Sequence, residues 1–103
     1  MFDISSIQAL FNGNAVKQRQ HFRNRIKERN IKKIDVAQAL LSGEIIEECP
    51  NDLPLPSILI LGYTKANKPL HIAVGVDDDI IWLVTAYFPT LDKWEADYKT
   101  RKG

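Results

Sequence analysis

Between residues 44 and 88, four apolar runs follow one another with only short, turn-like segments between them. These connections are too short to hold a crossover helix, so neighbouring strands must run antiparallel. The runs are, in chain order, 44–49 (EIIEEC), 57–63 (SILILGY), 70–76 (LHIAVGV) and 80–88 (IIWLVTAYF). The sequence therefore predicts a four-stranded, mainly antiparallel sheet.

The third run differs from its neighbours in its pattern. The second and fourth runs are apolar without alternation, which is typical of central strands covered on both faces. In the third run, aliphatic residues occupy every second position, and His71 is one of the residues between them. We therefore expect His71 to lie on the face opposite to the aliphatic side chains, among small residues.

Helical periodicity on both sides of the strands predicts four helices. Three precede the sheet, over 4–12, 15–29 and 33–42, and a short one over 91–100 closes the chain. Asn30, directly after the second helix, is well suited to the left-handed turn that ends a helix. The fold class is thus α+β, with N-terminal helices, a four-stranded mainly antiparallel sheet and a short C-terminal helix.

A chain of 103 residues with 45% hydrophobic residues fits a single domain over 1–103. No run approaches the roughly 18 to 20 apolar residues that span a bilayer, and the N-terminus lacks a basic leader with a small-residue cleavage site. We therefore expect a cytoplasmic protein with no membrane partner. A single cysteine, Cys49, and two histidines predict neither an intramolecular disulfide nor a metal cluster, and no cofactor is predicted.

Positive charge is concentrated in one segment of the chain. Residues 17–33 hold eight Lys and Arg against one Glu, whereas residues 34–98 carry a net charge of −8, and the whole chain is near neutral at +1. Such a patch predicts RNA contact at one place, with binding that weakens steeply with salt. The alternative is a basic stripe that is only the solvated face of an amphipathic helix.

Within that segment, His21, Arg25 and Arg29 recur every four residues, which places them on one side of a helix. An imidazole can take up or release a proton near neutral pH, and a guanidinium group can hold a phosphate. Together these groups are what binding or cleaving RNA without a metal requires.

Four stretches resemble a small bacterial family of uncharacterised domains that is often found beside zinc-finger antitoxin genes of the YgiT type. They are HFRNRIKERNI, DVAQALLSGEIIEE, ILGYTKANKPLHIAVGV and TAYFPTLDKW. That family is similar in outline to the RelE and BrnT toxins, which are compact ribonucleases paired with an antitoxin. The resemblance covers about residues 18–102. It implies a RelE/BrnT-like core over 15–102, with residues 1–14 as an N-terminal helical extension.

The resemblance implies a toxin-like, metal-independent endoribonuclease of the mRNA interferase kind, belonging to a type II toxin–antitoxin pair. Its partners would be RNA and a cognate antitoxin protein of the zinc-finger type. Cleavage would proceed by attack of a ribose 2′-hydroxyl on the adjacent phosphate, which needs a base and an acid. The candidate catalytic residues are His21, Arg25, Arg29, His71 and Tyr87. The candidate RNA-binding residues are Arg19, Arg23, Lys27, Lys65 and Lys68.

Three hypotheses stay open and predict different structures. An endoribonuclease requires the candidate histidines and arginines to converge on an open concave surface. A noncatalytic domain that binds RNA or an acidic protein requires an exposed basic stripe, with His71 buried away from it. A structural module that forms a homodimer through its sheet edge or C-terminal helix requires the basic side chains to be used in ion pairs with Glu28, Glu47 or Glu48.

Overall fold

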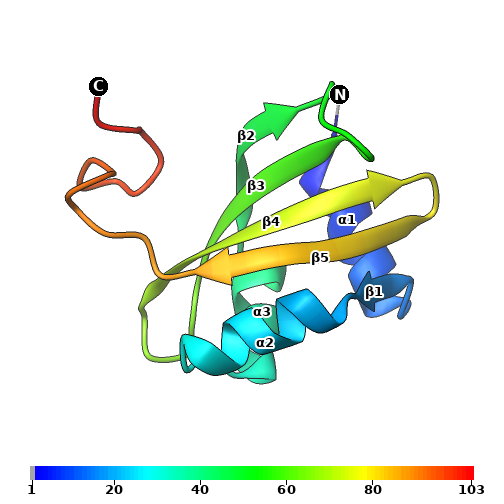
Figure 1. Cartoon of the computed structure of the whole chain (residues 1–103), viewed down its shortest axis with the longest axis horizontal. Coiled ribbons are helices and arrows are strands. Elements are labelled where there is room, and N and C mark those ends of the chain that lie inside the picture. Colours follow the sequence, from blue (N-terminus) through cyan, green and yellow to red (C-terminus); the bar gives the residue numbers. More distant parts are fainter. Residues whose placement is uncertain (1) are drawn as a thin grey trace.

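The computed structural model describes residues 2–103 and has helices on one side of a five-stranded sheet (Figure 1). The helices are α1 (Ile4–Asn12), α2 (Gln20–Glu28) and α3 (Lys33–Leu41). The strands are β1 (Val16–Gln18), β2 (Glu44–Cys49), β3 (Ser57–Tyr63), β4 (Pro69–Asp77) and β5 (Ile80–Tyr87). The sheet order is β1-β5-β4-β3-β2, and every neighbouring pair is antiparallel except β1 with β5. The mixed α+β class and the four antiparallel strands are confirmed.

The fifth strand corrects the prediction of a helix beginning at residue 15. Val16–Gln18 form β1, which runs parallel to β5 with Val16 opposite Ile81. A strand of three residues is too short to show a periodicity of its own, so its one apolar residue, Val16, also fits the helical pattern. Asn14, with a φ of 61°, turns the chain between α1 and β1. As a result, α2 begins at Gln20.

The predicted helix over residues 91–100 is wrong. This segment forms successive turns closed by a bridge between Trp94 and Arg101. Tyr98 has a φ of 58°, which an α-helix does not allow. The Asp97 carboxylate accepts hydrogen bonds from the backbone N–H groups of Lys99 and Thr100, and this local bonding competes with helix formation. The C-terminal segment is therefore a compact irregular cap.

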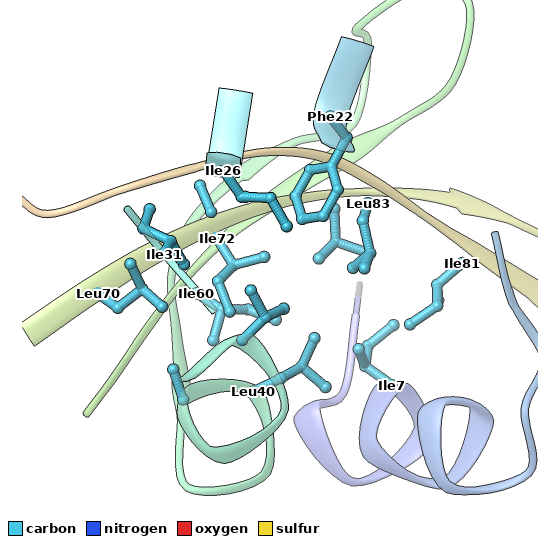
Figure 2. Packing of buried hydrophobic residues seen from close by; sticks show 14 of the residues in the cluster. Ile7, Phe22, Ile26, Ile31, Leu40, Ile60, Leu70, Ile72, Ile81 and Leu83 are labelled. Carbon is cyan, nitrogen blue, oxygen red and sulfur yellow. The ribbon is translucent and has the colours of Figure 1, made fainter. Parts of the chain in front are cut away.

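The hydrophobic core lies between the helices and one face of the sheet (Figure 2). Apolar side chains of all three helices meet the aliphatic side chains of β3, β4 and β5 there. The labelled members are Ile7, Phe22, Ile26, Ile31, Leu40, Ile60, Leu70, Ile72, Ile81 and Leu83. Within residues 2–103, no helix is long and apolar enough to cross a membrane.

The other face of the sheet carries the side chains that alternate with this core, and we call it the outer face. On β4 it presents His71, Ala73 and Gly75, and on β5 it presents Trp82 and Tyr87, which pair with Gly75 and His71. The segments 50–56 and 89–101 cover it in part, and two hollows remain between and beside them. Four of the side chains singled out from the sequence line these hollows, namely Arg19, His21, Arg29 and Tyr87.

Candidate active site

His71 lies completely buried on the outer face of β4, and both of its ring nitrogens are bonded. Nε2 lies 2.7 Å from the main-chain oxygen of Tyr98, and Nδ1 lies 3.2 Å from the hydroxyl oxygen of Tyr87. Because a carbonyl oxygen can only accept, Nε2 carries the hydrogen of the neutral ring. Nδ1 is then the acceptor for the Tyr87 hydroxyl group. The two contacts therefore fix one tautomer of His71.

Aromatic rings enclose this imidazole. The ring of Trp94 meets it edge to face at 4.4 Å between centroids, and the ring of Tyr87 does so at 5.2 Å. Burial lowers the pKa of His71 below its ordinary value, because the imidazolium would lose its hydration. The Tyr98 carbonyl and the charge of Glu47 oppose that shift. His71 is therefore neutral near pH 7 and has a base nitrogen directed at Tyr87.

Tyr87 lines a hollow of about 420 Å³ at the C-terminal end of β5, which we call the Tyr87 pocket. Cationic and aromatic side chains dominate its wall. The lining residues are Arg29, Tyr87, Phe88, Pro89, Thr90, Lys93, Trp94 and Arg101. Burial raises the pKa of Tyr87, while the charges of Arg101 and Arg29 act in the opposite direction. The phenol is thus protonated at neutral pH.

Arg29, at the C-terminal end of α2, reaches the edge of β5 that β1 leaves unpaired. Its Nη1 donates to the main-chain oxygen of Ala86 at 2.8 Å and to Oγ1 of Thr85 at 3.2 Å. A guanidinium group has five N–H donors, so these two bonds leave others free for a ligand in the pocket. Asn30, with a φ of 56°, ends α2 at this point, as its position in the sequence suggests. Arg29 is therefore a fixed cation at the rim.

Arg101 approaches the same pocket from the C-terminal segment. Its Nε and one terminal nitrogen bond the two carboxylate oxygens of Glu47 on β2, at 2.7 and 2.9 Å. Its guanidinium carbon also lies 4.7 Å from the centre of the Trp94 ring. The two-point contact sets the plane of the guanidinium group and leaves its other terminal nitrogen unused. Arg101 is thus a second oriented cation beside Tyr87.

Three of the five candidate catalytic residues come together here, namely Arg29, His71 and Tyr87. His21 does not join them. It lies at the other end of α2, about 12 Å from Arg29 along the helix axis, and lines the second hollow of the outer face. Arg25 lies between the two, is exposed, and pairs with Glu28 at 3.6 Å. His21, Arg25 and Arg29 therefore share one side of α2, but they do not belong to one site.

The candidate RNA-binding residues are spread over the surface. Arg19 lies beside His21 in the second hollow, whereas Arg23 and Lys27 are exposed on α2. Lys65 is exposed in the turn between β3 and β4. Lys68 ends that turn with its Nζ 5.7 Å from the centre of the Phe88 ring. It shares a small pocket with Arg29. Lys68 is thus the candidate that adds positive charge near the Tyr87 pocket.

Lys93, Trp94 and Arg101 complete the pocket and were not among the candidates. The sequence did offer a signal, because the chain ends in a basic segment, KTRKG. The helix predicted over 91–100 gave no indication that Arg101, which follows it, lies beside β2. Among residues 2–103, no group of three or more His, Cys, Asp or Glu side chains is placed to hold a metal ion. The pocket's own groups suit an anion and the movement of a proton.

Fold and site together define a small α+β domain with a cationic pocket built around a tyrosine–histidine pair. The chain belongs to the family described as "Domain of unknown function (DUF4258)", which matches residues 19–88. Membership of an uncharacterised domain family is thereby confirmed. The matched range includes all five candidate catalytic residues, whereas Lys93, Trp94 and Arg101 follow it. Comparison with curated proteins and with solved structures gives no match.

Proposed function

We propose that this domain is a toxin-like, metal-independent endoribonuclease that cleaves RNA in the Tyr87 pocket. The observation that carries the proposal is the hydrogen bond between the Tyr87 hydroxyl and Nδ1 of His71, at the wall of a pocket that also holds Arg29, Lys93 and Arg101. We include in this proposal that the domain is related to the RelE and BrnT toxins. The domain would act in the cytoplasm, with a cognate zinc-finger antitoxin as its inhibitor.

The tyrosine–histidine pair supplies the base. As the ribose 2′-hydroxyl attacks phosphorus, its proton passes to the oxygen of Tyr87 while the tyrosine's own proton passes to Nδ1 of His71. The imidazolium that forms keeps its Nε2–H bond to the carbonyl of Tyr98, and the charge of Glu47 favours it. His71 therefore acts through Tyr87, and Tyr87 is the group that contacts the substrate.

The cations supply the rest of the chemistry. Arg29 and Arg101 are each held by protein acceptors before substrate arrives, so they can bind the developing phosphorane charge without reorganising. Cleavage breaks the bond between phosphorus and the 5′-oxygen, which takes a proton from the ammonium group of Lys93 or from water. The products are a 2′,3′-cyclic phosphate and a free 5′-hydroxyl. Apart from His71, which lies behind Tyr87, the protein groups in these steps line the pocket.

Comparison of two tyrosine variants tests this proposal. Labelled RNA is incubated with the purified domain in the presence of a chelator, with and without ribosomes, and the product ends are identified. We expect cyclic phosphate ends, and a rate that falls about 100-fold or more in Tyr87→Phe. Tyr63→Phe is the matched control, because Tyr63 is exposed at the end of β3. This variant should cleave RNA at the wild-type rate. No cleavage by the wild type, or an unchanged rate in Tyr87→Phe, would overturn the proposal.

A noncatalytic RNA-binding domain is the second candidate, and the burial of His71 favours it. Arg23 and Lys27 are exposed one turn apart on α2, while His71 lies beneath the C-terminal segment. Salt-dependent RNA binding without any product would select this function. The structural hypothesis has less support, because within the described residues Arg25 alone in the segment 17–33 forms an ion pair. Homodimer formation through the free edge of β2 stays a prediction.

A further inference from the structure

The second hollow of the outer face has a volume of about 370 Å³ and lies around Trp82, so we call it the Trp82 hollow. The loop 50–56, β4, β5 and the start of α2 enclose it. Its wall is mainly apolar, and Arg19, His21, Asp52 and Ser57 are its polar lining residues. The Asp52 carboxylate accepts a hydrogen bond from Oγ of Ser57 at 2.6 Å, so the acid is already partnered. Within residues 2–103, Arg19 pairs with no acidic side chain, so the charge that stays free in the hollow is positive.

Small residues beside the indole give the hollow its shape. Gly75 is the register partner of Trp82 on the neighbouring strand, and Ala73 lies two residues before it on the same face. A carbon atom added at Gly75 would lie 3.5 Å from Leu55 and 3.7 Å from Trp82, in ordinary contact with both. Because Ala73 and Gly75 contribute almost no side-chain volume, Leu55 bounds the hollow on this side, and its volume of about 370 Å³ accommodates a flat group beside the half-buried indole ring.

Cations surround the same ring. Nζ of Lys17 lies 5.6 Å from the centre of the Trp82 ring, and the guanidinium carbon of Arg19 lies 5.1 Å from it. His21, two residues after Arg19, also lines the hollow. A ligand that fits these features has a flat, largely apolar body with a negative charge attached at one end. A nucleotide has both parts, since its base can stack on an aromatic ring while its phosphate meets the cations.

The hollow also lies in line with the proposed active site. A bulge in β5 puts both Trp82 and Tyr87 on its outer face, opposite Gly75 and His71, whose four-residue separation corresponds to about 13 Å along β4. A strand of about 4 to 16 nucleotides, the usual site size on a small single-strand-binding domain, is long enough to cover this distance. One RNA strand lying along β5 would therefore pass both places.

We infer that the Trp82 hollow is a subsite that holds one unpaired RNA base against Trp82, a few nucleotides away from the phosphate cleaved in the Tyr87 pocket. The inference rests on the proposed function for the identity of the ligand. The subsite would determine the position of cleavage along the strand. An anchored base fixes which phosphate of the strand lies beside Tyr87, so the domain cleaves at a set distance from that base.

Fluorescence gives a direct test, because the chain contains two tryptophans and Trp94 is buried beside His71. A Trp94→Phe, Tyr87→Phe double variant leaves Trp82 as the sole tryptophan and removes the proposed base. It is titrated with an oligoribonucleotide of about eight nucleotides, and with an abasic strand of the same length. We expect saturable quenching by the first and much weaker quenching by the second. Equal quenching by the two strands would overturn the inference.

Binding by a Trp82→Ala variant completes the test, with Trp82→Phe as the conservative partner. We expect affinity for the oligoribonucleotide to fall about tenfold in the alanine variant and to be largely restored in the phenylalanine variant, because a smaller ring still stacks. Ile34→Ala, which alters an exposed residue of α3 outside the hollow, is the control and should bind as the wild type does. Equal affinities in all three variants would contradict the subsite.

The outcomes separate the subsite from the proposed function. Base-dependent quenching in a domain that never cleaves RNA would support the subsite and reject the ribonuclease. Cleavage at unchanged positions by Trp82→Ala, without base-dependent quenching in the double variant, would support the ribonuclease and reject the subsite. Quenching by an acidic peptide, with no response to RNA, would assign the hollow to a protein partner and also overturn the inference.

Discussion

Gly62 of β3 lies directly against the backbone of Ala39 in α3. A side-chain carbon at position 62 would lie 1.7 Å from the carbonyl oxygen of Ala39, which is far inside contact distance. Ala39 is itself completely buried. The absence of a side chain at Gly62 thus sets how closely α3 approaches the sheet, and with it the depth of the core beneath β3 and β4.

Gly62→Ala should therefore destabilise the fold strongly, because α3 must move outward to admit the methyl group. We expect a loss of about 3 kcal/mol or more in the free energy of unfolding, measured by urea denaturation. Gly75→Ala is the matched control on the neighbouring strand, where the added carbon meets nothing closer than 3.5 Å. A loss below about 1 kcal/mol at Gly62 would show that the helix shifts freely.

His71 should make stability depend on pH. Burial lowers its pKa in the folded protein, so near pH 7.5 the ring is neutral in both states and contributes nothing to the pH dependence. As the pH falls below about 6.5, the unfolded chain takes up a proton that the folded chain does not, and the free energy of unfolding falls. Urea denaturation from pH 7.5 to 5 measures the effect. His71→Gln should have a shallower dependence, and an equally steep one would assign the effect to other groups.

Asn30 tests the left-handed turn that ends α2. Its φ of 56° is costly for a residue with an ordinary side chain, and asparagine and glycine tolerate it. We expect Asn30→Ala to lose about 1 kcal/mol of stability and Asn30→Gly to lose little or none. Thermal denaturation of the two variants makes the comparison. Similar melting temperatures for both would indicate that the turn changes its conformation.

Trp94 and Leu91 distinguish the observed C-terminal cap from the helix that periodicity predicts. A helix would place both residues on one buried stripe, whereas the structure buries Trp94 to 3% exposure and leaves Leu91 51% exposed. We expect Trp94→Ala to cost about 3 to 5 kcal/mol, because it removes the ring packed on His71. Leu91→Ala should cost well under 1 kcal/mol by the same denaturation measurement. Equal costs would support the helix.

Glu47→Gln should separate stability from activity. The Glu47–Arg101 pair is partly exposed, so its loss should change the free energy of unfolding by less than about 1 kcal/mol. Cleavage should fall further, because Arg101 loses the two-point contact that orients it beside Tyr87. Glu48→Gln, on the adjacent residue of β2, is the control for charge alone. A parallel loss of activity in both variants would point to net charge.

The central part of the fold could be predicted from the sequence because each element there is long enough to show its own period. Strands β2 to β5 and helices α1 and α3 lie within one or two residues of their predicted bounds. The errors lie between α1 and α3 and after β5. β1 has three residues and pairs with a strand more than sixty positions away. Tyr98 adopts a left-handed backbone conformation that no local sequence pattern predicts.

For the site, the sequence identified types of residue better than their arrangement. His71 and Tyr87 belong to separate strands, and only the register of β4 with β5 brings them into contact. Periodicity put His21 on the same side of α2 as Arg29, but it cannot tell where the helix crosses the sheet. Arg101 contacts Glu47 across 54 residues of chain, and no local sequence motif spans such a separation.

The family match over residues 19–88 stops short of the two segments that finish the sheet. β1 covers the first half of the outer edge of β5, and the segment 89–101 covers His71. A fragment cut at the bounds of the match would have a bare strand edge and an uncovered aromatic surface, both of which promote aggregation. For recombinant expression, the unit to keep therefore extends at least from α1, because Ile7 lies in the core and Gln8 donates to the main-chain oxygens of Leu40 and Leu41, to residue 101.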